Sequence, residues 1–219
     1  MRIRRRPWAK QELEEAKFYI DDPTQYKGKW HELFQNDKPI HLEIGCGKGS
    51  FIAILASRHQ ENNYIAADMI EAMLGLSKRN IEKAYSDVKL DINNLYLIRM
   101  NAERILDSFS RDDIVDRIYI NFCNPWPRGK HNKRRLTHTR QLEHYKEFLN
   151  KDSGEIYFKT DSDYLFEDSL NYLQETGFKI EKITYDLHND LIFEDIRTEH
   201  EQMFSEEGIK IKALIAKIK

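Results

Sequence analysis

Two segments of the sequence place chemically capable residues at the ends of apolar runs. The first, HLEIGCGKGSF, ends an apolar run at Glu43 and follows it with Gly45, Gly47 and Gly49. Glycines at this point let the chain turn sharply and let backbone N–H groups approach a ligand closely. A second acid, Asp68, ends the next apolar run, where a carboxylate can accept hydrogen bonds from ribose hydroxyls. This segment therefore predicts a nucleotide-type site.

The glycine spacing indicates which nucleotide. It reads G-x-G-x-G rather than the G-x-G-x-x-G of dinucleotide-binding folds, and no Lys-Ser/Thr pair follows to hold a phosphate. A third apolar run ends at Asn101 and Ala102, which could contact an adenine edge. S-adenosylmethionine, an adenosine ligand without pyrophosphate, fits these features best. Glycines that only form a turn are the alternative, and the acids at 43 and 68 disfavour it.

The second segment, INFCNPWPRGKHNKRRL over 120–136, joins a loop motif to a basic run. Asn124 begins an Asn-Pro-Trp-Pro loop at the end of a predicted central strand, where folds of this kind place their chemistry. The following eight residues contain His131 and the cations Arg128, Lys130, Lys133, Arg134 and Arg135. Because no acid interrupts the run and it adjoins the loop, we expect it to bind a phosphate backbone. A solvated basic surface is the alternative.

Strands and helices alternate along the chain and position both segments. Strands are predicted at 40–44, 64–68, 95–100, 116–122 and 154–160, and helices at 10–20, 70–84, 139–150 and 163–176. One further helix follows the glycine motif, while 21–39 is predicted to be irregular. Two late runs, 178–186 and 208–219, are predicted to pair antiparallel at a sheet edge. The pattern favours a mostly parallel, seven-stranded α/β sheet, with 1–39 as an N-terminal basic arm and helix and 40–219 as the main domain.

Composition excludes several classes of protein. The 219 residues include 35 Lys plus Arg and 37 Asp plus Glu, so the chain as a whole is no polycation. Charge is uneven, however: 117–142 holds seven cations and no acid, and 186–207 holds eight acids. We expect neither a membrane helix nor a secretory signal, and two distant cysteines favour a cytoplasmic protein. The histidines lack metal-ligand spacing, so we predict no metal.

Five motifs, in order and spacing, resemble the bacterial tRNA (guanine-N(7)-)-methyltransferase family. They are EIGCGKG, NAERI, FCNPWPRGKHNKRRL, FKTDSDYLF and RTEHE. Many methyltransferases share the glycine motif, whereas the PWP-plus-basic segment followed by FKTD and T-x-x-E is specific to this family. The resemblance implies the class I, Rossmann-like methyltransferase fold, S-adenosylmethionine as cofactor, and a guanosine in the tRNA variable loop as target.

The resemblance also implies roles for individual residues. Cofactor-contacting positions of the family are occupied by Glu43, Asp68, Asn101 and Asn124. Positions that hold the target nucleotide are occupied by Arg128, Asp161 and the segment from Thr198 to Glu201. The stretch from Lys130 to Arg135 matches the one that lies along the RNA.

Local chemistry offers alternatives for three of these residues. Asp161 could accept hydrogen bonds from the N1–H and amino group of guanine, but Asp161 also suits a helix cap. Thr198 and Glu201 form a T-x-x-E pattern, which is equally a capping box. The residue types alone do not decide between nucleotide binding and helix capping.

The chain departs from the family at the loop. The family usually has Asp-Pro-Trp-Pro-Lys, and this chain has Asn124 and Arg128; the family also often has Glu where Asp68 stands. Guanine N7 carries a free lone pair, so methyl transfer needs alignment and polar stabilisation rather than a general base. We therefore predict an active enzyme with Asn124 as the catalytic-loop residue.

Two other functions stay open at this stage. Asn124-Pro125-Trp126 partly resembles the Asn-Pro-Pro-aromatic loop of methyltransferases that act on exocyclic amines of RNA or DNA bases. A catalytically weak RNA-binding protein with a methyltransferase fold would also accommodate Asn124. A nicotinamide oxidoreductase is disfavoured by the glycine spacing and the basic run. The sequence decides neither which tRNAs are modified nor whether the protein is a monomer or a homodimer. It also assigns no role to the arm residues Arg2, Arg4, Arg5 and Arg6.

Overall fold

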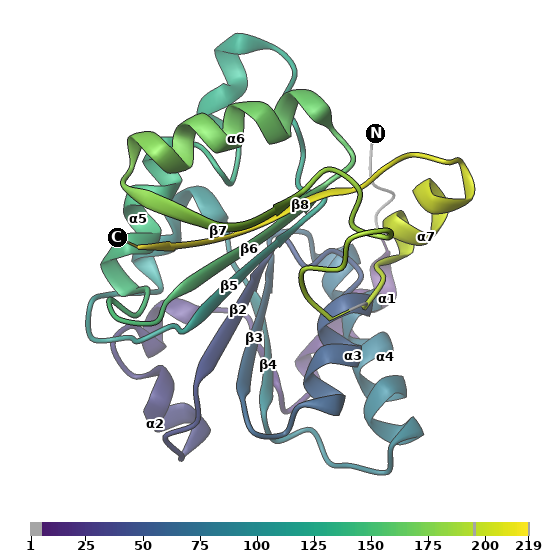
Figure 1. The fold of residues 1–219 in the computed structure, drawn as a ribbon. Coiled ribbons are helices and arrows are strands. Elements are labelled where there is room, and N and C mark those ends of the chain that lie inside the picture. The colour runs from purple at the N-terminus through teal and green to yellow at the C-terminus, as the bar shows by residue number, and fades with distance from the viewer. Residues whose placement is uncertain (1–5, 195, 219) are drawn as a thin grey trace. The chain divides into compact units, whose positions relative to one another are not determined.

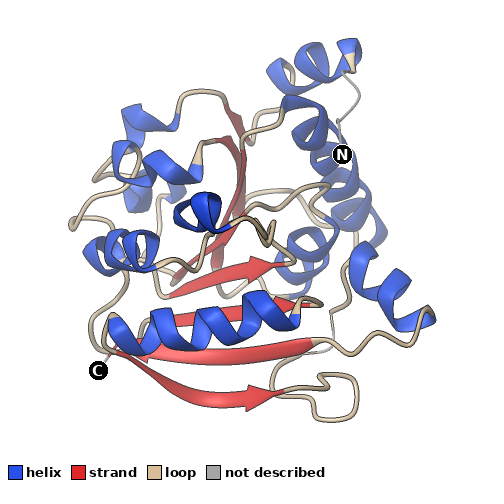
Figure 2. Cartoon of the chain, turned by 90° about the horizontal axis from the view of Figure 1, so that it is seen from above, coloured by secondary structure: helices blue, strands red, loops and turns tan. Residues whose placement is uncertain are grey.

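A computed structural model describes residues 6–194 and 196–218 (Figure 1). The chain divides into two compact units, Met1–Asp113 and Ile114–Lys219. Arg2, Arg4 and Arg5 of the predicted arm lie outside the described residues. Figure 2 distinguishes the helices and strands that make up the units. No helix within the described ranges is long and apolar enough to cross a membrane.

The first unit contains four parallel strands in the order β1-β4-β3-β2. They are β1 (Tyr19–Ile20), β2 (Ile40–Ile44), β3 (Asn63–Asp68) and β4 (Leu95–Arg99). The helices are α1 (Pro7–Glu14), α2 (Trp30–Phe34), α3 (Ser50–Arg58) and α4 (Glu71–Asp87), with short 3-10 turns at Pro23–Tyr26 (η1) and Ala102–Asp107 (η2). All five residues of β2 are buried, as expected for a parallel strand covered on both faces.

The N-terminal helix differs from its prediction over 10–20. It begins at Pro7, because the fixed φ of proline suits a first helical turn. It ends at Glu14, and the chain then forms β1, whose Tyr19 and Ile20 pair with Leu97 and Ile98. This two-residue strand raises the number of strands in the described chain to eight, one more than predicted. A strand of two residues is too short to show an alternation of apolar and polar residues in the sequence.

The second unit holds the antiparallel edge. Its strands are β5 (Arg117–Asn121), β6 (Glu155–Thr160), β7 (Phe178–Thr184) and β8 (Lys212–Ile218), in the order β5-β6-β8-β7. β5 and β6 are parallel, while β8 pairs antiparallel with both β6 and β7. The helices are η3 (Gly129–Arg134), α5 (Thr139–Phe148), α6 (Asp163–Glu175) and α7 (Glu199–Glu206). The predicted antiparallel pairing of the two late runs is confirmed.

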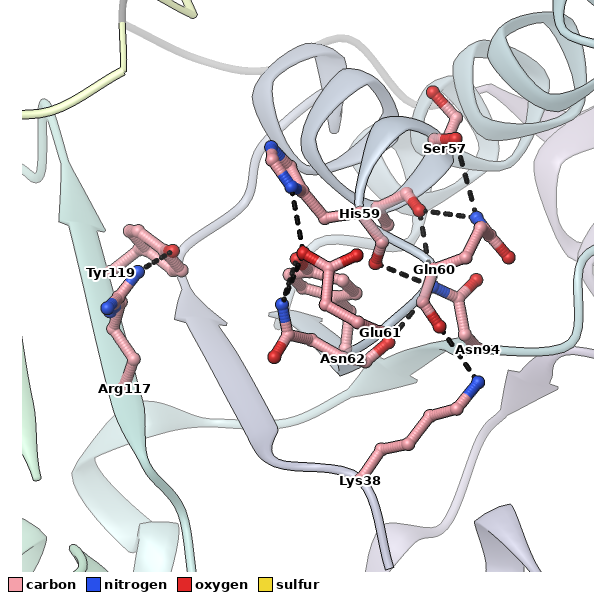
Figure 3. Close-up of polar contacts among 11 residues, drawn as sticks. Lys38, Ser57, His59, Gln60, Glu61, Asn62, Asn94, Arg117 and Tyr119 are labelled. Carbon is pink, nitrogen blue, oxygen red and sulfur yellow. Dashed lines mark hydrogen bonds and ion pairs between the residues drawn. The ribbon is translucent and has the colours of Figure 1, made fainter. Parts of the chain in front are cut away.

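A buried asparagine fastens the end of α3 to the start of β4 (Figure 3). Asn94 donates to the carbonyls of Ala56, His59 and Asn62 at 3.2, 3.4 and 3.0 Å, and it accepts from the Tyr85 hydroxyl of α4. With both ends of the amide satisfied, this buried group stabilises the packing of α3 and α4. Those two helices in turn hold the glycine loop.

Candidate functional site

The glycine loop follows β2 and leads into α3. The N–H groups of Gly45 and Cys46 both donate to the carbonyl of Ala67, at 2.8 and 3.0 Å, which ties the start of the loop to β3. Gly47 and Gly49 have φ values of +56° and +70°, a left-handed region that favours glycine. A Cβ at Gly47 would meet nothing within 4 Å, so the loop is open on that side. A Cβ at Gly49 would lie 2.7 Å from the Ser77 Oγ.

Two polar residues of α4 hold the glycine loop in place, and no sequence motif predicted them. Ser77 donates to the Gly47 carbonyl at 2.8 Å, and Asn80 donates to the Lys48 carbonyl at 2.8 Å. Ser77 is fully buried on the apolar side of the helix, beside Leu74 and Ile81 in the helical repeat. A buried serine on an apolar helix face needs a partner, and that position was the available signal.

The acids Glu43 and Asp68 lie near the carboxyl ends of β2 and β3, which pair as neighbouring strands. Asp68 accepts from the Gly47 N–H at 3.0 Å and from the Ile70 N–H at 2.8 Å, so it also shapes the glycine loop. Burial raises the pKa of the Asp68 carboxyl, and those backbone hydrogen bonds oppose the shift. Glu43 is buried at 2% exposure.

The end of β4 completes this group of strand ends. Asn101 is exposed and its side chain accepts from the Glu103 N–H at 3.0 Å, capping η2, of which Ala102 is the first residue. β4 lies beside β3. The structure thus brings the predicted cofactor residues of the first unit to the carboxyl ends of three adjacent parallel strands, the usual ligand-binding edge of such sheets.

The Asn-Pro-Trp-Pro loop of the second unit has an unusual backbone. Trp126 in this loop and Phe122 just before it adopt φ values of +43° and +49°, which non-glycine residues rarely do. The Asn124 side chain accepts from the Trp126 N–H at 3.0 Å and so supports the turn. Strained backbone of this kind gathers at functional sites, where the surrounding structure holds it in place.

Most of the basic run is exposed next to this loop. Arg128, Lys130, Lys133 and Arg134 are all exposed, as binding to phosphate requires. The Arg134 guanidinium lies 5.2 Å from the centre of the Trp126 ring. The ring of the half-buried His131 lies 5.7 Å from the same Trp126 ring. These residues combine cations with aromatic surface, an arrangement suited to nucleic acid.

Arg135 is a correction to the prediction of an RNA contact. Its side chain is 0% exposed, so it cannot reach a phosphate as the chain stands. It donates instead to the carbonyls of Pro125 and Trp126, and it pairs with Asp168 at 2.5 Å. The sequence did not distinguish this cation from its exposed neighbours, because its burial depends on Asp168 and Tyr172 of the later helix α6.

Asp161 follows β6 and is half-buried. The N-cap of α6 is the neighbouring residue and not Asp161: Ser162 accepts from the Leu165 N–H at 3.2 Å. Lys212 donates to the Asp161 backbone carbonyl at 3.0 Å. Among the residues described, no side chain donates a hydrogen bond to the Asp161 carboxylate, which leaves its oxygens available to a ligand.

The T-x-x-E segment forms the capping box that its pattern allowed. Thr198 accepts from the Glu201 N–H at 3.0 Å, and Glu201 accepts from the Thr198 N–H at 3.3 Å. Glu201 is also paired with Lys159 of β6 at 2.6 Å and lies 3.2 Å from His188. Both side chains of the Lys159–Glu201 pair are at most 2% exposed. The structure thus shows capping, while nucleotide contact by this segment stays a prediction.

The cysteine at the end of β5 is not poised as a nucleophile. Burial raises the pKa of the Cys123 thiol to about 12, so the reactive thiolate is scarce at neutral pH. Burial also raises the pKa of the Cys46 thiol, with the charges of Asp68 and Glu43 adding to the shift.

Comparison with known proteins places this architecture among methyltransferases. A family model described as "Putative methyltransferase" matches residues 37–214. Among solved structures, an antibiotic-related methyltransferase is 19% identical with a TM-score of 0.60, covering 90% of this chain and 94% of the other. The 16S rRNA methyltransferase KamB is 16% identical with a TM-score of 0.63, covering 87% and 93%. These confirm the predicted class I methyltransferase fold.

Relatives identified by sequence have a much higher identity to this chain. A protein of Clostridium beijerinckii named tRNA (guanine-N(7)-)-methyltransferase is 58% identical over 216 residues, 99% of this chain and 98% of its own. A protein of the same name from Ruminiclostridium cellulolyticum is 52% identical over 220 residues, 100% of this chain and 93% of its own. The loop motifs, the strand-end acids and these near full-length relatives agree, and the chain belongs to the tRNA (guanine-N(7)-)-methyltransferase family.

Proposed function

We propose that this protein transfers a methyl group from S-adenosylmethionine to N7 of a guanosine in the tRNA variable loop. The observation that carries the proposal is the near full-length similarity to enzymes of that name. The open glycine loop and the exposed basic run support it from the structure. Because tRNA is the substrate, the proposal also places the protein in the cytoplasm.

The glycine loop and its acids fit S-adenosylmethionine. The open side of Gly47 leaves room that a Cβ would fill, and the Asp68 carboxylate beside it suits ribose hydroxyls. We assign the remaining contacts to Glu43, Gly45, Gly49, Asn101, Ala102 and Asn124. When bound, the sulfonium of this cofactor supplies an electrophilic methyl group.

The second unit would bind the nucleic acid. The Asp161 carboxylate suits the N1–H and amino donors of guanine, which adenine does not present together. Arg128 would bind the target nucleotide, with Thr198 and Glu201 as further candidates. Lys130, His131, Lys133 and Arg134 would lie along the RNA backbone, where exposed cations replace counterions.

Asn124 would position rather than remove a proton. N7 of neutral guanine already has a lone pair, so no general base is required. The Asn124 oxygen supports the Trp126 turn in this structure, and the amide NH₂ remains a donor for a guanine carbonyl or another acceptor. Such a fixed dipole can stabilise charge as it moves onto the purine.

The proposal is tested by incubating the protein with labelled S-adenosylmethionine and unmodified tRNA, then digesting the RNA for nucleoside mass spectrometry. We expect 7-methylguanosine. A methylated exocyclic amine would instead support the Asn-Pro-aromatic alternative. If calorimetry shows that the cofactor binds and yet no methyl group is transferred, the protein is a catalytically inactive binder or needs a partner.

A further inference from the structure

We propose that Arg135 is a positioning residue that holds the Asn-Pro-Trp-Pro loop in its working conformation and does not contact tRNA. The inference rests on the proposed function, because it assigns that loop to methyl transfer. Arg135 would therefore have a different role from the exposed cations that precede it in the basic run.

The Arg135 guanidinium has partners on every side. Nε donates to the Pro125 carbonyl at 2.8 Å, and Nη2 donates to the Trp126 carbonyl at 3.3 Å. Nη1 donates to the Asp168 carboxylate at 2.5 Å and to the Tyr172 hydroxyl at 3.2 Å. The Tyr164 ring lies 4.7 Å from the guanidinium carbon. These hydrogen bonds use four of the five N–H donors of the guanidinium, and the side chain is 0% exposed, so it cannot reach a phosphate.

These contacts fix the strained part of the loop. Trp126 has a φ of +43°, which an L-residue avoids unless its surroundings impose it. The peptide between Pro125 and Trp126 is held at both ends: Arg135 binds its carbonyl, and the Asn124 oxygen accepts from its N–H. The next carbonyl, of Trp126, is held by Arg135 as well. Arg135 and Asn124 together therefore define the path of the loop.

The anchor of this arrangement is α6. Asp168 and Tyr172 are one helical turn apart on that helix, and both bind the same guanidinium nitrogen. Arg135 thus links the loop to α6 and fixes the position of the loop relative to that helix. A lysine cannot do the same, because a single ammonium cannot hold two carbonyls and a carboxylate in the planar geometry of a guanidinium.

The test compares Arg135→Lys with Lys133→Gln, a matched exposed cation of the same run. Methylation kinetics give kcat and the KM for tRNA, and tRNA binding is measured at several salt concentrations. For Arg135→Lys we expect kcat to fall roughly tenfold or more, as misplaced catalytic groups cause, with the salt dependence of binding unchanged. For Lys133→Gln we expect a raised KM and a salt slope smaller by about one.

Milder variants keep the test informative if Arg135→Lys does not fold. Asp168→Asn and Tyr172→Phe weaken only the anchor on α6, and each should lower kcat with little change in the KM for tRNA. A salt slope reduced in Arg135→Lys as much as in Lys133→Gln would overturn the proposal, as would a rise in KM with kcat intact.

Failure of the proposed function is distinguishable from failure of this inference. If the wild-type protein binds tRNA but forms no 7-methylguanosine, the proposed function is wrong. The salt slopes then still decide whether Arg135 contacts the RNA.

Discussion

Replacing Gly49 by alanine should destabilise the first unit through one identifiable contact. Gly49 has a φ of +70°, and its added Cβ would lie 2.7 Å from the Oγ, 2.9 Å from the Cβ and 3.1 Å from the Cα of Ser77. The left-handed conformation costs an alanine about 1–2 kcal/mol, and overpacking against a helix typically adds about 1–3 kcal/mol. A total of about 3 kcal/mol lowers the Tm by about 6–12 °C in a protein of this size.

Gly47→Ala is the matched control, because it imposes a similar backbone strain without the clash. Its φ is +56° and its Cβ would meet nothing within 4 Å. We expect a Tm decrease of only about 2–8 °C, together with weaker S-adenosylmethionine binding. A loss of 1.4 kcal/mol in ligand contact corresponds to about a tenfold higher Kd.

Thermal unfolding by circular dichroism and cofactor titration by calorimetry measure both effects. Equal Tm decreases in the two variants would show that the contact with Ser77 does not limit the loop, and the steric reasoning would be refuted. Unchanged cofactor affinity in Gly47→Ala would show that the open side of the loop is not where the cofactor binds.

Three further predictions concern single side chains. Asp161→Asn should lower kcat/KM for tRNA about 10- to 100-fold, since hydrogen bonds to a charged acceptor contribute about 1.5–3 kcal/mol; an unaffected rate in the methylation assay would remove Asp161 from the site. Asn124→Asp keeps the oxygen that accepts from Trp126, so its methylation rate should stay within about tenfold, and a larger loss would mean that the amide is adapted to its position. Lys159→Met leaves Glu201 buried without its cation and should cost about 3–5 kcal/mol in denaturant unfolding; a cost below about 1 kcal/mol would contradict a dry ion pair.

The parts of the fold with a strong local pattern were predictable. IHLEI at 40–44 is rich in β-branched and apolar residues, with His41 and Glu43 between them, and it forms the buried strand β2 with the predicted bounds. β1 was missed because its two residues gain their strand conformation from pairing with β4, and no local pattern encodes a distant partner. The position of β8 between β6 and β7 is likewise a property of the assembled sheet.

The site shows the same division between local and distant information. The glycines and the strand-end acids could be predicted, because turns and strand ends depend on residues that are near in the sequence. Ser77 was not, because its partner is the carbonyl of Gly47, thirty residues earlier. The burial of Arg135 depends on Asp168 and Tyr172 of a later helix, so composition alone grouped it with the exposed cations.

The strand order of the second unit has a consequence for how the protein is made. β8 pairs with both β6 and β7, yet it follows both in the chain, so a ribosome delivers the two outer partners before the strand that joins them. Until β8 emerges, β6 and β7 each present an open edge, which invites unwanted pairing. Closure of this sheet must wait for residues 212–218, and the end of β6, where Asp161 lies, takes its final surroundings only after β8 has been synthesised.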